Sequence, residues 1–190
     1  WQMFDRTAPV PVNQPIVAFT ASSQSQEVLL STGDGRMVSL SAPQADSLLR
    51  ETGITRGEEE LDYQQTIRET EIHTLTTPRC GAYQLRLADG TQVWLNAESR
   101  LKYPSRFTGE QRVVELEGEG YFKVTPDSQR PFIVKSGNIT TEVLGTEFNV
   151  RTYVPDDSHV TLLKGSVKVK NTDSSSEVVI RPGEDAHLQG

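Results

Sequence analysis

Residues 111–124, QRVVELEGEGYFKV, alternate between apolar and polar side chains. Successive side chains of a β-strand point to opposite faces of a sheet, so Val114 and Leu116 share one face and the glutamates between them share the other. We expect two strands here, at 111–116 and 120–124. A strand with one apolar and one polar face is typical of an antiparallel sheet that packs on a core with one side and meets water with the other.

The same alternation recurs on both sides of this stretch, in short segments separated by turn-forming residues. The other expected strands are 84–87, 92–95, 132–135, 139–144, 147–153, 159–164, 166–170 and 177–181. Gly120, Gly145 and Gly165 each stand just before an alternating strand, where glycine permits a tight corner. We therefore predict an all-β fold of many short strands, in a solenoid-like, double-stranded β-helix or sandwich arrangement, with at most one short helix.

Two Asp-Gly pairs flanked by apolar residues, Asp34-Gly35 and Asp89-Gly90, predict β-hairpins. Such pairs favour type I′ turns, in which both central residues have positive φ. The residues around the two pairs match at a constant offset of 55. Either the chain contains two similar β units, or the two hairpins share turn chemistry by necessity.

Residues 41–54 are the best candidate for a helix, and Gly53 is expected to end it. The acidic stretch that follows is weakly patterned, with Leu61, Tyr63 and Ile67 as the expected inward residues. Its run of three glutamates is more typical of a solvated turn than of a cation site.

The composition disfavours several classes of function. With 26 acidic and 19 basic residues the formal charge is -7, and no cluster of Lys and Arg stands out, which disfavours nucleic-acid binding. The one cysteine, Cys80, has no partner for an intramolecular disulfide and is expected to be buried at a tight turn. The sequence has no run of about 18 apolar residues that would predict a membrane span. Residues 1–15 hold three prolines and are interpreted as a linker, and a start at Trp1 leads us to expect a processed or excised fragment.

No pattern typical of catalysis emerges from the sequence. The three histidines are His73, His159 and His187. A metal enzyme on this kind of fold would need two histidines one residue apart on a strand, and these are not. Glu115, Glu117 and Glu119 form a stripe, which is typical of a solvated sheet face, whereas a glycosidase needs two acids across a cleft. We predict that the protein is not an enzyme and has no catalytic, cofactor-binding or metal-binding residues.

Several segments occur in this chain in the order in which one known family has them. They are TTPRCGAYQL (76–85), LADGTQVWLNA (87–97), RFTG (106–109), VELEGEGYFKV (114–124), RPFIV (130–134), VLGTEFNV (143–150), LKGSV (163–167) and PGE (182–184). Over residues 72–188 the chain resembles the periplasmic domain of FecR-family anti-sigma factors. Cys80 and Gly120 stand where the family pattern leads us to expect glycine and alanine.

The resemblance implies a sensor or scaffold domain on the periplasmic side of a single-pass inner-membrane protein. Such a protein relays a signal from the signalling domain of a TonB-dependent outer-membrane transporter to an extracytoplasmic-function (ECF) sigma factor, which its cytoplasmic part contacts. No cofactor and no direct contact with nucleic acid are implied. The resemblance implies that residues 1–15 are a linker that follows a membrane helix outside this chain, and that residues 16–190 are a FecR-like β domain with its core at 72–188. It also implies that the family's usual C-terminal receptor-contacting domain is lacking from this chain. The resemblance assigns no partner-binding residues.

A different class of function remains as the alternative, a periplasmic carbohydrate-binding module. Such a module stacks sugars on exposed aromatic rings that share one sheet face. The candidates are Trp94, Tyr103, Tyr121 and Tyr153. A hydrolase on a β-helix ranks third, because it needs a carboxylate cleft that the sequence does not suggest.

Overall fold

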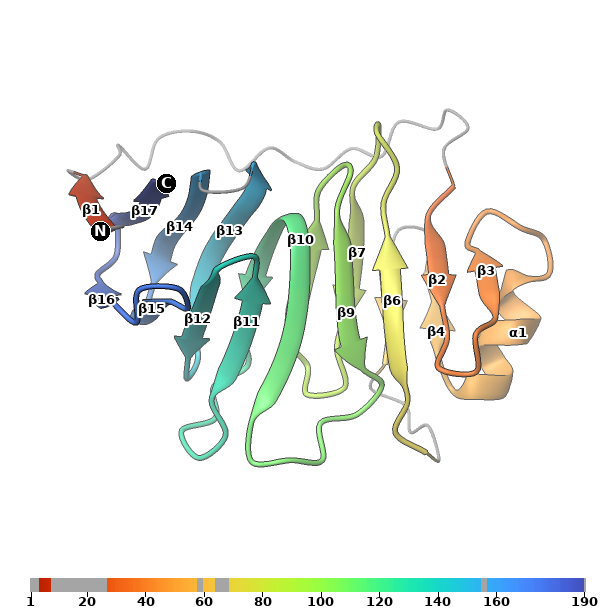
Figure 1. The fold of residues 1–190 in the computed structure, drawn as a ribbon. Coiled ribbons are helices and arrows are strands. Elements are labelled where there is room, and N and C mark those ends of the chain that lie inside the picture. The colour runs from red at the N-terminus through yellow and green to blue at the C-terminus, as the bar shows by residue number, and fades with distance from the viewer. Residues whose placement is uncertain (1–3, 8–26, 58–59, 64–68, 155–156, 190) are drawn as a thin grey trace.

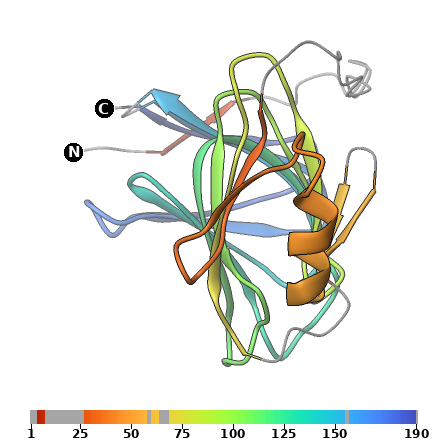
Figure 2. The ribbon, with the colours of Figure 1, turned by 90° about the vertical axis from the view of Figure 1, so that its right-hand side faces the viewer.

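The structure is a computed structural model that describes residues 4–7, 27–57, 60–63, 69–154 and 157–189 (Figure 1). Its strands form two sheets that face each other across one core, and a long strand, β10, belongs to both. The sheets extend along the length of the molecule, and a helix, α1 (Ala45–Thr52), lies at one end (Figure 1, Figure 2).

Sheet A contains nine of the described strands. In spatial order they are β4 (Thr55–Arg56), β5 (Glu60–Asp62), β7 (Tyr83–Arg86), β8 (Gln92–Leu95), β10 (Arg112–Lys123), β13 (Glu147–Val154), β14 (Asp157–Lys164), β17 (Asp185–Gln189) and β1 (Phe4–Thr7). Sheet B also contains nine, with β10 counted again. They are β3 (Met37–Ser39), β2 (Leu29–Ser31), β6 (Ile72–Thr76), β9 (Arg100–Pro104), β10, β11 (Phe132–Ser136), β12 (Ile139–Val143), β15 (Val167–Asn171) and β16 (Glu177–Ile180).

Successive hairpins alternate between the two sheets. The hairpin β11–β12 lies in sheet B, β13–β14 in sheet A and β15–β16 in sheet B again, and each lies farther along the molecule than the one before (Figure 1). This is the winding of a double-stranded β-helix, and its two facing layers give it the form of a sandwich (Figure 2). The predicted all-β class with one short helix is confirmed.

The expected strands between residues 84 and 181 are confirmed to within two residues at each end, with one exception. The two strands predicted at 111–116 and 120–124 are one strand of 12 residues, β10. Its first half pairs with β9 and β11 in sheet B, and its second half pairs with β8 and β13 in sheet A. The change of sheet falls at Gly118, whose φ is +92°, so the corner predicted at Gly120 was misplaced by two residues.

Glycine is also required at the two later corners, as predicted. A Cβ atom added to Gly145 would lie 2.7 Å from the Cα of Pro126, closer than such atoms approach. Gly165 has a φ of +100°, which other residues rarely adopt. Backbone proximity and positive φ therefore explain both positions.

Both Asp-Gly hairpins are present, as β2–β3 and β7–β8. Only the glycine of each pair has positive φ, +82° at Gly35 and +84° at Gly90, so the turns are not of the predicted type I′. In each turn the aspartate carboxylate accepts the backbone N–H two residues on, at 3.1 Å after Asp34 and 2.9 Å after Asp89. This local bond stabilises the turn with the aspartate at negative φ.

The N-terminal third agrees with most of the predictions for it. Helix α1 lies within the expected range and ends at Gly53, which is left-handed with a φ of +79°. Leu61 and Tyr63 are buried, as expected, and Ile67 lies outside the described residues. Part of the predicted linker forms β1, which pairs antiparallel with β17, and the other residues of 1–15 are not described.

The prediction that Cys80 is buried is wrong, since its side chain is exposed. Cys80 lies in the turn between β6 and β7, which connects sheet B to sheet A. This turn does not pack on the apolar face of either sheet, so the side chain stays exposed. The core itself lies between the sheets, where Phe122 and Phe148 stack with ring centroids 5.2 Å apart. Burial of each such ring contributes roughly 1.5–3 kcal/mol to folding.

Candidate functional site

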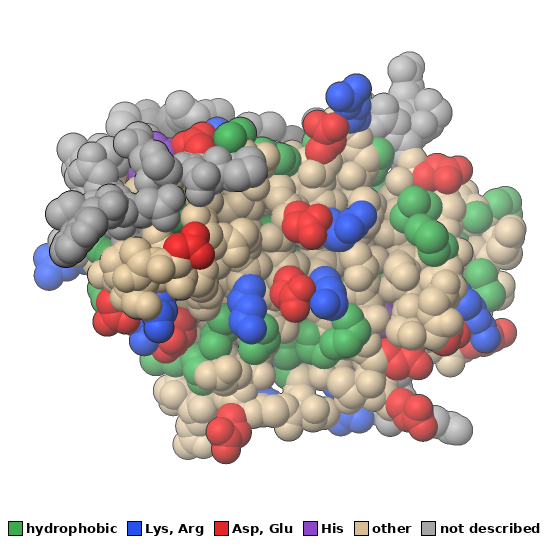
Figure 3. Space-filling view, viewed as in Figure 1, with side chains coloured by type: hydrophobic (Ala, Val, Ile, Leu, Met, Phe, Trp, Pro, Cys, Tyr) green, Lys and Arg blue, Asp and Glu red, His purple; other side chains and the backbone are tan. Residues whose placement is uncertain are grey.

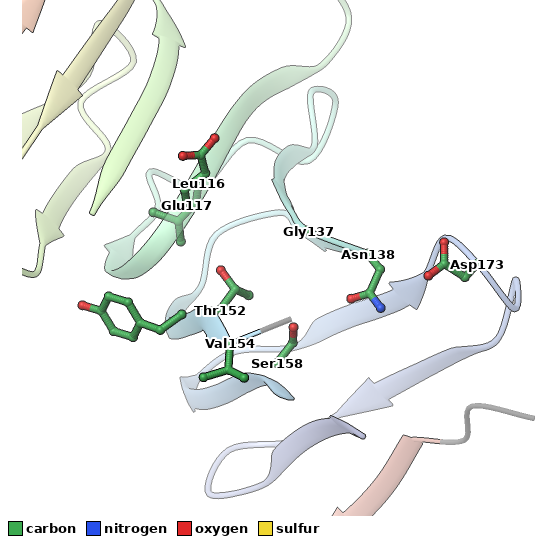
Figure 4. A pocket seen from close by; sticks show the side chains of 9 residues that line it. Leu116, Glu117, Gly137, Asn138, Thr152, Val154, Ser158 and Asp173 are labelled. Atoms are coloured by element: carbon green, nitrogen blue, oxygen red, sulfur yellow. The ribbon is translucent and has the colours of Figure 1, made fainter. Parts of the chain in front are cut away.

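A groove of about 310 Å³ lies where β10 changes sheet (Figure 4). Four segments far apart in the sequence form it: the bend of β10, the β11–β12 turn, the end of β13 with the start of β14, and the loop before β16. Its lining residues are Leu116, Glu117, Gly137, Asn138, Thr152, Tyr153, Val154, Ser158 and Asp173. The alternation of hairpins between sheets brings these segments together, and no local sequence pattern marks them.

The groove has an apolar side and an acidic rim. Tyr153 and Val154, at the end of β13, are 42% and 55% exposed and form the apolar side. Tyr153 is held in place because its hydroxyl donates to the carbonyl oxygen of Ala97 at 2.7 Å. Glu117 and Asp173 supply negative charge, and no Lys, Arg or His is among the described residues that line the groove. This surface suits contact with an apolar or basic segment of a partner.

The predicted glutamate stripe is divided by the bend of β10. Glu115 and Glu117 face outward from sheet B and pair with Lys102 at 3.2 Å and Arg100 at 3.8 Å. Figure 3 shows acidic and basic side chains next to each other across the centre of this face. Glu119 belongs to the sheet A half of the strand, where amide side chains donate to its carboxylate. The three acids thus do not face one cleft.

The aromatic residues proposed for sugar stacking are only partly brought together. Trp94 and Tyr121 lie side by side on the outer face of sheet A, with ring centroids 5.3 Å apart. Burial and the nearby Glu147 carboxylate, which accepts the hydroxyl hydrogen at 3.3 Å, raise the pKa of Tyr121 to about 12. Tyr103 is buried at 1% exposure and Tyr153 lies at the groove, so neither shares that face.

The three histidines lie in two places. His159 and His187 are neighbours on β14 and β17, on the outer face of sheet A. His73 is fully buried, and its Nδ1 lies 2.8 Å from the hydroxyl of Tyr63, to which the hydroxyl of Tyr103 donates at 3.0 Å. Burial lowers the pKa of His73, against the opposing effect of the nearby Glu71 carboxylate.

This buried histidine predicts a loss of stability in mild acid. The folded protein binds a proton at His73 less readily than the unfolded chain, whose histidine pKa is about 6.5, so stability falls as the pH drops below that value. We expect up to about 1.4 kcal/mol of lost unfolding free energy per pH unit at the steepest point. Urea unfolding of the parent protein and of His73→Gln at pH 7.5, 6.5 and 5.5 measures how the free energy of unfolding depends on pH. Equal slopes for the two proteins would show that His73 does not cause the effect.

Two facing, mainly antiparallel sheets that share one bent strand define a β-sandwich domain, and its groove, with an apolar side and an acidic rim, is suited to binding a partner. Residues 73–168 match the FecR protein family, and the chain belongs to this family. The matched region runs from β6 into β15 and includes the bend of β10.

Two crystal structures of "a putative anti-sigma factor from Parabacteroides distasonis ATCC 8503" are similar to the chain, at 35% sequence identity. The 2.50 Å structure superimposes with a TM-score of 0.58 over 60% of this chain and 53% of that protein. The 1.65 Å structure gives 0.56 over 59% and 52%. The chain thus spans about half the length of these relatives. No curated protein matches the chain. The described helix, α1, is not long and apolar enough to cross a membrane.

Proposed function

We propose that this chain is the periplasmic sensor and scaffold domain of a transmembrane anti-sigma factor. In this proposal the domain relays a signal from a TonB-dependent outer-membrane transporter to an ECF sigma factor, and it catalyses no reaction. The observation that carries the proposal is the FecR match over residues 73–168, which spans the centre of the sandwich. The similarity to the two crystal structures, at 35% sequence identity, also supports it.

The architecture suits a stiff scaffold between the membrane and a receptor-facing domain. Sheet A and sheet B share β10, so the two layers are connected through the backbone of one strand as well as through side-chain packing. A stack of hydrogen-bonded hairpins is stiff along its length, as in other repeat-like folds. Such a body holds a receptor-facing domain at a fixed distance from the membrane.

Calorimetry tests the proposal with two proteins in parallel. The complete periplasmic region and this 190-residue chain are each titrated with the N-terminal signalling domain of the transporter encoded beside it. Binding by the longer protein supports the relay, and binding by the chain as well places part of the interface on the β domain. If neither protein binds, the proposed relay is wrong.

The groove is the first surface on which to look for that interface. Val154→Asp places a charge on the apolar side of the groove, and we expect it to weaken transporter-domain binding by the complete periplasmic region about tenfold, as loss of an interface anchor does. Met37→Asp is the matched control, because Met37 is 66% exposed and lies on β3 near α1, away from the groove. If the two variants bind the transporter domain with equal affinity, the groove is not part of the interface.

A carbohydrate-binding module is the second candidate, favoured by the adjacent rings of Trp94 and Tyr121 on an outer sheet face. Titration with oligosaccharides, followed by the tryptophan fluorescence of the parent protein and of Tyr121→Ala, separates the two functions. A saturable change that Tyr121→Ala abolishes would favour the carbohydrate module.

A further inference from the structure

The sequence contains the motif Asp-Xaa-His twice, at Asp157-Ser-His159 and at Asp185-Ala-His187. The first lies on β14 and the second on β17, and the two strands are antiparallel neighbours. Their register places His159 directly opposite His187. Residues two apart on a strand share a face, so all four side chains lie on the outer face of sheet A.

The two imidazole rings are directed at one carboxylate oxygen. They stack with centroids 3.9 Å apart and an angle of 14° between their planes. The Nε2 of His187 lies 2.7 Å from Oδ1 of Asp157, and the Nε2 of His159 lies 3.2 Å from the same atom. One ligand atom from each of these three residues falls within 4.8 Å of the other two. Two nitrogens and one oxygen thus converge as the ligands of a single cation do.

A second carboxylate orients one of the histidines from the other side. Oδ2 of Asp185 lies 2.9 Å from Nδ1 of His159, and the hydroxyl of Thr161 donates to Oδ1 of Asp185 at 2.7 Å. This partner favours the tautomer of His159 with the proton on Nδ1, which leaves the Nε2 lone pair for a metal ion. Metal-binding histidines are typically held in this way by a carboxylate behind them.

We propose that Asp157, His159 and His187 bind a divalent transition-metal ion, with Asp185 as the positioning residue behind His159. Two imidazoles and one carboxylate suit zinc and its neighbours better than calcium or magnesium, which prefer oxygen ligands. Bonds of about 2.0–2.2 Å require the carboxylate of Asp157 to move back from the two nitrogens. Its side chain is 46% exposed, so a change of rotamer is open to it.

The surroundings favour a bound cation. Asp157 and Asp185 supply two negative charges, against Arg151, which lies opposite His159 on β13. The histidine side chains are 23% and 15% exposed, which leaves the ligands accessible to an ion from solution. Three protein ligands leave a further position for water, as in an open site.

Calorimetric titration of the chelator-treated, dialysed chain with zinc chloride at pH 7.5 tests the proposal. We expect one ion per chain, and about a 100-fold loss of affinity or more in His159→Gln and in His187→Gln. Asp185→Asn is expected to lose roughly 10–100-fold, the usual effect of removing an orienting carboxylate. Glu110→Gln, which changes an exposed acid in the loop before β10, is the matched control and should bind zinc as the parent does. Absence of saturable binding, or an equal loss in the control, would overturn the proposal.

A further readout does not depend on the variants folding well. Zinc should raise the melting temperature of the parent protein, because an ion that binds only the folded state stabilises it. An unchanged melting temperature at saturating zinc would mean that the four residues form only an ion-paired cluster, and the metal site would be rejected.

Discussion

Replacing Arg112 with methionine is expected to lower the free energy of unfolding by about 3–5 kcal/mol, since it leaves a buried charge without its partner. Arg112 begins β10, and its side chain is about 1% exposed. Its Nη1 donates to the carboxylate of Asp89 at 2.7 Å, and that carboxylate is itself only 7% exposed. Methionine keeps much of the side-chain volume, so the loss reports on the charge and its hydrogen bonds more than on a cavity.

The guanidinium also connects three segments of backbone. Its Nε donates to the carbonyl oxygen of Arg130 at 2.9 Å, and Nη1 donates to that of Thr125 at 2.8 Å. Asp89 belongs to the β7–β8 turn, so one side chain ties this turn to the start of β10 and to the loop before β11. Loss of Arg112 would leave these partly buried acceptors without their hydrogen bonds, which costs more than the net value of each bond.

Urea denaturation measures the loss of unfolding free energy in Arg112→Met, with Arg100→Met as the control. Arg100 pairs with Glu117 at 3.8 Å on the outer face of sheet B, and both side chains are more than half exposed. Such a surface pair contributes about 0–1 kcal/mol, so the control should remain close to the parent protein. If the two variants lose the same free energy, the buried pair does not stabilise the fold as argued. A double-mutant cycle with Asp89→Asn then gives the coupling energy.

The alternation of apolar and polar residues was enough to predict most strands, because each strand packs one face on the core. It was not enough to predict Arg112–Asp89, since these residues are 23 positions apart and meet only after β10 pairs across the sheets. The alternation also led us to predict two strands where β10 is one. A strand that passes from one sheet to the other without a break shows the same alternation of apolar and polar residues as two separate strands. Helix α1, by contrast, ends at Gly53 as predicted, because its end depends on local backbone geometry.

The candidate sites were harder to predict than the strands for the same reason. The groove combines Leu116, Asn138, Tyr153 and Asp173 from four separate segments, and none of them is unusual within its own segment. The histidine cluster did carry a signal, the repeated Asp-Xaa-His motif, which a search for two histidines one residue apart missed. Recognising it requires the register of β14 against β17, which the sequence does not specify.

Gly118→Ala is expected to destabilise the fold by about 2–6 kcal/mol, because two costs add at this corner. The first is backbone strain: φ is +92°, a conformation that costs a residue with a Cβ atom about 1–3 kcal/mol. The second is overlap: the new Cβ would lie 2.4 Å from Oγ and 2.9 Å from Cα of Ser99, and overpacking of this kind costs about 1–3 kcal/mol.

Ser99 cannot simply move away from the new atom. Its Oγ accepts the backbone N–H of Glu119 at 2.9 Å and donates to the carbonyl oxygen of Ala97 at 2.9 Å. Rotation of the side chain would break both bonds, and the new methyl group would still overlap the backbone of Ser99. The strand bend and the loop before β9 are therefore fitted to each other, and the alanine forces one of them to shift.

Gly35→Ala separates the two costs. Gly35 has a similar φ of +82°, but a Cβ atom there would meet nothing within 4 Å, so only the strain applies. We expect a loss of about 1–2 kcal/mol for Gly35→Ala in urea denaturation, and a clearly larger one for Gly118→Ala. Equal losses would mean that the backbone at the corner relaxes around Ser99. A larger loss at Gly118 would establish that the change of sheet within β10 depends on the close approach of two backbones, which only glycine allows.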